Sequence, residues 1–121
     1  MVGKVLIVED KEDARVLMKV LIKMSGHEPI LAEDGREAIE KAKETEPSLI
    51  FMDLAMPVMD GIEATQTLRK TERFANTPII ALTAYGELRG QEANEAGCNE
   101  VIPKPLDFGR LQPVLDKYLG N

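Results

Sequence analysis

Residues 49–61 read LIFMDLAMPVMDG, and this stretch contains the pattern on which the rest of the fold is built. An apolar run at 49–52 leads to one acid, Asp53, and the turn-forming residues Pro57 and Gly61 follow it. Such a run is typical of a strand that is buried on both faces of a parallel sheet. In open parallel sheets, ligands bind outside the carboxyl ends of the strands. A lone acid there can also cap a helix or start a turn, so the other strand ends must decide its role.

Outward from this stretch, apolar runs alternate with amphipathic segments. Strands are expected at Lys4–Val8, Glu28–Ala32, Leu49–Asp53, 78–82 and Glu100–Pro103, and helices at 13–25, 36–45, 62–72, 86–96 and after Asp107. Five such alternations predict an α/β fold. We expect a doubly wound, five-stranded parallel sheet with helices on both faces and right-handed crossovers.

Two helices carry specific expectations. In the helix at 13–25, Leu17, Val20, Leu21 and Met24 have the spacing of one stripe facing the core. The segment 86–96 is a poor helix with little apolar anchoring, because a glycine inside it costs about 1 kcal/mol relative to alanine. It is therefore expected to be an element of low stability.

The last helix contains a proline. Asp107 has the character of an N-cap, while Pro113 removes one N–H and clashes with the carbonyl of Gly109. Either this helix is kinked, or it begins later than Asp107. Both alternatives remain open from the sequence.

Composition narrows the class of protein. A chain of 121 residues, 44% hydrophobic and 30% charged, is expected to form one domain over 1–121. A net charge of −6 argues against partners such as nucleic acid or an anionic membrane surface. No apolar run approaches the roughly 18 residues that a membrane span needs. Cys98 stands alone, which excludes a disulfide framework or a CxxC motif. A cytoplasmic protein is expected.

Polar residues stand at the other strand ends. Glu9 and Asp10 follow the first strand, Thr83 follows the fourth with the apolar Ala84 beside it, and Lys104 follows the fifth. Each alone could be a cap, a turn former or a solvated charge. Because the carboxyl ends of parallel strands lie along one edge, however, these side chains are expected to converge on Asp53.

Such a cluster favours phosphoryl transfer. Neighbouring carboxylates raise one another's pKa unless a cation lies among them. Oxygen ligands suit Mg²⁺, which commonly bridges to phosphate, with Mn²⁺ as the alternative ion. A carboxylate such as Asp53 can accept a phosphoryl group as an acyl phosphate. Its oxygens would then be neutralised by the metal, an ammonium and a hydroxyl, and the last two roles suit Lys104 and Thr83.

The segments KVLIVED, AEDGREAIEKA, LIFMDLAMPVMDG, PIIALTA and PKP occur in this order along the whole chain. With them the chain resembles the receiver domain of two-component response regulators, the CheY-like family. The resemblance implies a (βα)5 flavodoxin-like sheet of order 2-1-3-4-5. It also implies a signalling phosphoacceptor rather than an enzyme, with a sensor histidine kinase as phosphodonor.

The resemblance also implies roles for single residues at the metal. Asp53 would be the phosphoacceptor. Asp10 would ligate Mg²⁺ directly, Glu9 through a water molecule, and Ala55 through its backbone carbonyl.

Other residues would bind the phosphoryl group and respond to it. Lys104 would bind its oxygens, and Lys104-Pro105 would be a cis peptide, which proline makes accessible. Phosphorylation adds roughly −1.5 to −2 charges. This charge would draw in the switch residue Thr83, with Ala84 beside it, and rearrange the helix at 86–96.

Three positions depart from the usual family pattern or modulate it. Val101 stands where the family often has an aromatic residue that moves with the switch threonine, so such a relay is not expected by default. Ala55 and Tyr85 occupy the positions that tune the lifetime of the phosphoryl group. Ala55 cannot orient a water molecule and Tyr85 would crowd its approach, so slow autodephosphorylation is expected.

The mode of output stays open within this family. The protein could be a stand-alone receiver that binds a target protein, a relay that passes phosphate to a histidine phosphotransfer protein, or a receiver from a larger regulator or hybrid kinase. Met1 and the end at Asn121 favour the first two.

Two other functions are possible on this fold, but the sequence lacks the motifs that they usually need. A flavin- or nucleotide-binding module would need a phosphate-binding loop after the first strand, where Glu9 and Asp10 stand instead. A phosphatase with an aspartate nucleophile usually carries DxDxT, whereas Leu54, Ala55 and Met56 follow Asp53. A burst of turnover on small phosphate esters would favour the phosphatase.

Overall fold

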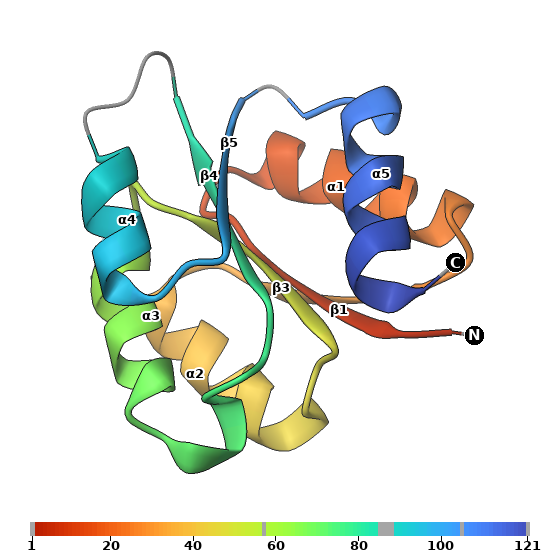
Figure 1. The fold of residues 1–121 in the computed structure, drawn as a ribbon. Helices are drawn as coiled ribbons and strands as arrows, with labels where there is room; N and C mark the ends of the chain where they lie inside the picture. The colour runs from red at the N-terminus through yellow and green to blue at the C-terminus, as the bar shows by residue number, and fades with distance from the viewer. Residues whose placement is uncertain (1, 57, 85–88, 105, 121) are drawn as a thin grey trace.

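A computed structural model describes residues 2–56, 58–84, 89–104 and 106–120. Its five parallel strands have the order β2-β1-β3-β4-β5 (Figure 1). The strands are β1 (Lys4–Val8), β2 (Glu28–Ala32), β3 (Leu49–Asp53), β4 (Ile79–Thr83) and β5 (Glu100–Pro103). The predicted flavodoxin-like sheet is therefore confirmed. Only β4 differs from the expected range, by one residue, so that Thr83 ends the strand instead of following it.

Helices cover both faces of this sheet. They are α1 (Glu12–Met24), α2 (Gly35–Thr45), α3 (Gly61–Arg69), α4 (Gly90–Ala96) and α5 (Phe108–Leu119), with a short 3₁₀ helix at Glu72–Phe74. Helices α1 and α5 lie on one face, and α2, α3 and α4 lie on the other (Figure 1). Within the described residues, no helix has both the length and the apolar character needed to cross a membrane.

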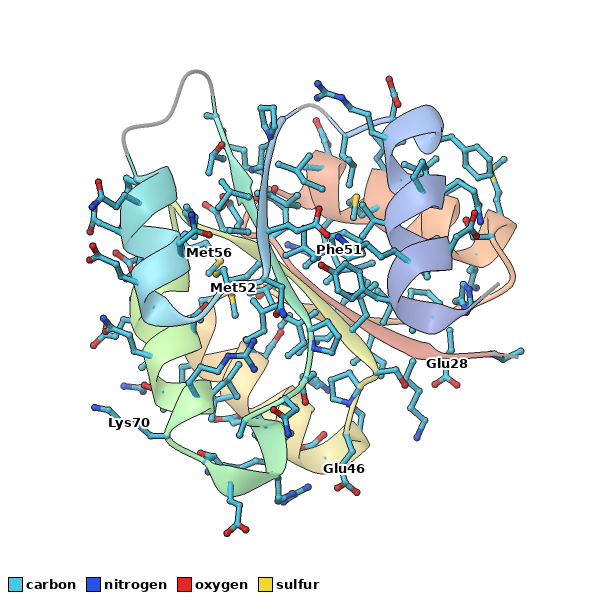
Figure 2. The ribbon with its side chains drawn as sticks, viewed as in Figure 1. Glu28, Glu46, Phe51, Met52, Met56 and Lys70 are labelled. Atoms are coloured by element: carbon cyan, nitrogen blue, oxygen red, sulfur yellow. The ribbon has the colours of Figure 1, made fainter. Side chains whose placement is uncertain are left out.

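The central strand β3 shows why its sequence is apolar throughout. All five of its residues are buried. Phe51 packs in the core cluster beneath α1 and α5, whereas the next residue, Met52, packs in the cluster beneath α2, α3 and α4 (Figure 2). Successive side chains of a strand point to opposite faces. A strand covered by helices on both sides must therefore be apolar at every position, as residues 49–52 are.

The prediction of which residues of α1 face the core is wrong for three of the four residues. The residues that this helix buries are Met18, Leu21 and Ile22. Three of the four expected core residues are instead exposed: Leu17 by 52%, Val20 by 46% and Met24 by 67%. Apolar residues lie on two sides of this helix, and both sets have helical spacing. Only packing against the sheet decides which set is buried.

The last two helices resolve further expectations. Helix α4 is described from Gly90 to Ala96, and the expected start at 86 lies outside the described residues. Asp107 is confirmed as the N-cap of α5, because its Oδ1 accepts a hydrogen bond of 2.9 Å from the backbone N–H of Arg110. Helix α5 begins directly after this cap and continues through Pro113. The alternative of a later start is therefore wrong.

His27 makes folding stability depend on pH. The side chain is 4% exposed, and its Nδ1 accepts a 3.0 Å hydrogen bond from the backbone N–H of Gly3. Burial lowers the pKa of His27, and the charge of Asp116 opposes this only in part. Nδ1 can accept this hydrogen bond only while it carries no proton.

We therefore expect stability to fall as the pH drops below about 6.5, the ordinary pKa of histidine, because the unfolded chain then binds a proton that the folded chain excludes. The contribution is complete above that pH and is lost as the pH approaches the lower folded pKa. Urea unfolding between about pH 5 and pH 7.5 measures this effect, which is on the order of 1 kcal/mol or less. His27→Gln should weaken the pH dependence, and an unchanged dependence in that variant would contradict the assignment.

Candidate functional site

Strand register brings the polar strand ends together. In the pairing of β3 with β4, Asp53 lies opposite Leu82, and in that of β4 with β5, Thr83 lies opposite Pro103. Glu9 directly follows β1, which neighbours β3 on its other side. The carboxyl ends of four adjacent strands therefore form one edge. The structure places Glu9, Asp53, Thr83 and Lys104 there.

Three acids form the centre of this edge. Glu9, Asp10 and Asp53 each offer a carboxylate oxygen, and these oxygens all lie within 4.8 Å of one another. Glu9 is 2% and Asp53 3% exposed. Among the described residues, Asp10 Oδ1 is the one buried side-chain polar atom that lacks a hydrogen-bond partner. Buried polar atoms are rarely left unpaired. This oxygen-only donor set with an unpaired oxygen fits a small divalent cation such as Mg²⁺.

Lys104 supplies the positive charge within the cluster. Its Nζ lies 2.7 Å from Glu9 Oε1 and 3.2 Å from Asp53 Oδ1. The backbone N–H of Lys104 donates a 2.6 Å hydrogen bond to the carbonyl of Thr83. One ammonium among three carboxyl groups leaves an excess of acidic groups. The cluster can therefore accept a further cation.

The charges shift the pKa values unequally. Burial, followed by the neighbouring Glu9, raises the pKa of Asp53 to about 7. Burial also acts against the charged form of Glu9, but the interactions with Asp53 and Lys104 lower the pKa of Glu9 overall. Although burial opposes it, the two acids raise the pKa of Lys104. Clustering of the acids therefore destabilises the charged form of Asp53 and not that of Glu9. Strongly shifted carboxyl groups of this kind are typical of functional sites.

The loop after β3 is held from two directions. The backbone N–H of Ala55 donates a 3.2 Å hydrogen bond to Asp53 Oδ1. Farther along, Asp60 Oδ1 caps α3 by accepting a 2.9 Å hydrogen bond from the N–H of Glu63. From the start of α4, Arg89 donates to the carbonyl of Leu54 at 3.2 Å and to Asp60 Oδ2 at 3.0 Å. Arg89 thus links α4 directly to the segment that carries Asp53.

Of the other residues predicted from the sequence, the structure describes some and leaves out others. Thr83 is 3% exposed at the end of β4, and Ala84 beside it is exposed. Val101 is half-buried and packs against the core cluster beneath α4. The expectations for Tyr85 and for the peptide bond before Pro105 fall outside the described residues.

Two arginines near the site, Arg15 on α1 and Arg89 before α4, were not predicted from the sequence. Arg89 reaches Leu54 across 35 positions. A long charged side chain on a helix usually lies in solvent. Spacing therefore gives no sign that either arginine turns toward the sheet edge.

A family model described as the response regulator receiver domain matches residues 5–116. The polar-differentiation response regulator DivK of Brucella ovis is 37% identical over 123 residues, covering 100% of this chain and 99% of that protein. DivK of Brucella melitensis has the same identity and coverage.

Solved structures give the same picture. The chemotaxis protein CheY4 of Vibrio cholerae superposes with a TM-score of 0.91 at 31% identity, covering 98% of this chain and 99% of that one. The receiver domain of the sensor histidine kinase PA1611 from Pseudomonas aeruginosa gives 0.92 at 30% identity, with full coverage of both chains. That structure has a magnesium ion coordinated in its active site cleft.

Proposed function

This chain belongs to the response regulator receiver family, a family of signalling phosphoacceptor domains, and from that membership we propose that Asp53 is its phosphorylation site. The observation that carries the proposal is the buried contact between Asp53, Glu9 and Lys104 at the carboxyl edge of the sheet. The phosphodonor is a phosphohistidine of a sensor histidine kinase. The whole chain, 1–121, acts as one receiver domain.

The proposed cofactor is Mg²⁺. Asp10 and Asp53 would ligate it directly, Glu9 through a water molecule and Ala55 through its backbone carbonyl. The unpaired oxygen of Asp10 and the magnesium ion in the PA1611 receiver domain support this assignment. When bound, Mg²⁺ neutralises the carboxylates and the oxygens of the phosphoryl group.

The side chains have distinct roles in the transfer. A carboxylate oxygen of Asp53 attacks phosphorus, the P–N bond to the donor histidine breaks, and the histidine nitrogen keeps the bonding electron pair. Lys104 binds a phosphoryl oxygen, for which it is well placed at 3.2 Å from Asp53 Oδ1. The hydroxyl of Thr83 donates to another oxygen, with Ala84 beside it. These donors stabilise charge where it develops in the transition state.

Phosphorylation then acts as a switch. It adds roughly −1.5 to −2 charges next to Glu9 and Asp10. The response passes through Thr83 and the segment before α4 to a partner protein in the cytoplasm. That partner is either a direct target or a histidine phosphotransfer protein of a relay, and neither nucleic acid nor membrane is bound.

The test is phosphorylation of the full chain with a small phosphodonor such as phosphoramidate, with Mg²⁺ or with EDTA. We expect one phosphoryl group per chain, detected by intact mass, only when Mg²⁺ is present. Borohydride reduction followed by peptide mapping should place the modification at Asp53. A modification at another residue, or equal labelling in EDTA, would contradict the proposal. Sustained turnover of phosphate esters would favour the phosphatase alternative.

The acyl phosphate is expected to be long-lived. Ala55 has no polar group to orient an attacking water molecule, and Tyr85 is bulky enough to obstruct its approach. Tyr85→Ala should therefore hydrolyse the acyl phosphate several times faster than the wild type. The decay is followed by intact mass after removal of the phosphodonor, with Tyr118→Phe on α5 as the control. Unchanged or slower decay in Tyr85→Ala would contradict the role of Tyr85.

A further inference from the structure

Arg15 is a nearly buried cation in the first half of α1, next to the acidic cluster. Its side chain is only 13% exposed. Nη1 donates a 2.9 Å hydrogen bond to the backbone carbonyl of Glu9 and a longer one, 3.5 Å, to that of Asp10. Nη2 pairs with Glu33 Oε1 at 3.2 Å. The guanidinium thus binds the main chain of both acids.

The segment held by Arg15 has left the sheet. The N–H of Glu9 still donates to the carbonyl of Ala32 at 3.0 Å, as in a strand. One residue later, the N–H of Lys11 bonds to Glu9 Oε2 at 3.2 Å. Arg15 therefore holds the carbonyls of Glu9 and Asp10, while Lys104 and the N–H of Lys11 hold the Glu9 carboxylate.

The positive charge of Arg15 by itself weakens Mg²⁺ binding, whereas holding the acids in position strengthens it. A cation near the acids lowers their affinity for Mg²⁺, because like charges repel. If charge alone mattered, removal of Arg15 would tighten Mg²⁺ binding. If Arg15 positions the acids, its removal would weaken Mg²⁺ binding. The sign of the change separates the two effects.

We propose that Arg15 is a positioning residue of the metal site, which holds the main chain of Glu9 and Asp10 so that both carboxylates face the cation. The inference rests on the proposed Mg²⁺-dependent phosphorylation of Asp53. Arg15 acts through the two acids, as the outer partners of metal ligands do in general.

The test compares wild type with Arg15→Gln, Arg15→Lys and the control Lys23→Gln. Lys23 is exposed in the last turn of the same helix. Calorimetric titration with MgCl₂ gives the affinity for Mg²⁺ without any phosphodonor. The rate of phosphorylation by phosphoramidate is then measured as a function of Mg²⁺ concentration.

We expect Arg15→Gln to weaken Mg²⁺ binding by about tenfold, as losses of outer partners commonly do. The Mg²⁺ concentration for half-maximal rate should rise by the same factor, while the rate at saturating Mg²⁺ stays near that of the wild type. Arg15→Lys keeps the charge but loses the planar, forked arrangement of donors. Its affinity for Mg²⁺ should therefore lie between those of the wild type and Arg15→Gln. Lys23→Gln should bind as tightly as the wild type or slightly more tightly.

Equal or tighter binding by Arg15→Gln would overturn the inference and leave only the effect of charge. If Arg15→Gln does not fold, the test rests on Arg15→Lys. Wild-type Mg²⁺ affinity in Arg15→Lys would also overturn the positioning role of Arg15. A fall in the saturating rate without a change in the half-maximal concentration would indicate a purely structural role and would count against it. If wild type binds no Mg²⁺, the proposed function fails together with the inference; if wild type binds and the Arg15 variants match it, only the inference fails.

Discussion

Asp53→Asn is expected to form no acyl phosphate when it is incubated with Mg²⁺ and a small phosphodonor. An amide oxygen is a far weaker nucleophile than a carboxylate, and the acyl phosphate requires the carboxylate oxygen itself. Intact mass over the time in which wild type is fully labelled is the measurement. The control is Asp13→Asn, an exposed acid in the first turn of α1, which should be labelled like the wild type. Equal labelling of Asp53→Asn would remove Asp53 as the acceptor.

The same variant should be more stable than the wild type without metal. The pKa of Asp53 is raised to about 7, so the unfolded chain loses this proton at a lower pH than the folded chain. Stability is therefore lost as the pH rises from about 4 toward 7, and Asn has no such proton to lose. Asn can also accept the N–H of Ala55. Urea unfolding in EDTA at neutral pH should show a gain on the order of 1–3 kcal/mol, and a loss would contradict the charge argument.

Gly61→Ala should destabilise the fold by about 2–4 kcal/mol, because overpacking against main chain cannot be relieved by a rotamer change. A Cβ at Gly61 would lie 2.3 Å from the carbonyl oxygen of Asp53 and 2.9 Å from the Cα of Leu54. Both atoms belong to the segment that carries Asp53, the proposed acceptor. Phosphorylation by a small donor should therefore slow in the fraction of the protein that still folds.

The matched control is Gly90→Ala at the start of α4. Among the described residues, no atom beyond its chain neighbours and the backbone of its own helix lies within 4 Å of a Cβ built there. Alanine is the better helix former by up to about 1 kcal/mol, so this variant should be neutral or slightly more stable. Urea unfolding of both variants gives the comparison. If Gly61→Ala matches Gly90→Ala in stability, the close approach of α3 to the acceptor segment is not real.

The acids of the site follow from sequence because a parallel sheet leaves little freedom. Once five strands are recognised by their apolar runs, their carboxyl ends must share one edge. Glu9 and Asp53 then meet although they are far apart in the chain. The order of the strands determines which strand ends are neighbours, and this order was expected from the resemblance to a known family.

The helices were less predictable. On α1, Leu17 and Met18 both belong to apolar stripes of helical spacing, and only Met18 is buried. Such a choice depends on how the helix is rotated against the sheet, and rotation is set by packing, not by periodicity.

Sequence patterns suffice to predict the alternation of elements, the buried central strand and the convergence of acids on Asp53. These features depend on local patterns and on the geometry that every parallel sheet shares. Three contacts are visible only in the folded protein: Arg15 holds Glu9 and Asp10, Arg89 reaches the carbonyl of Leu54, and Gly61 lies against the carbonyl of Asp53. Contacts of this kind depend on the placement of whole helices to within an ångström, because a hydrogen bond or a steric clash is gained or lost over that distance.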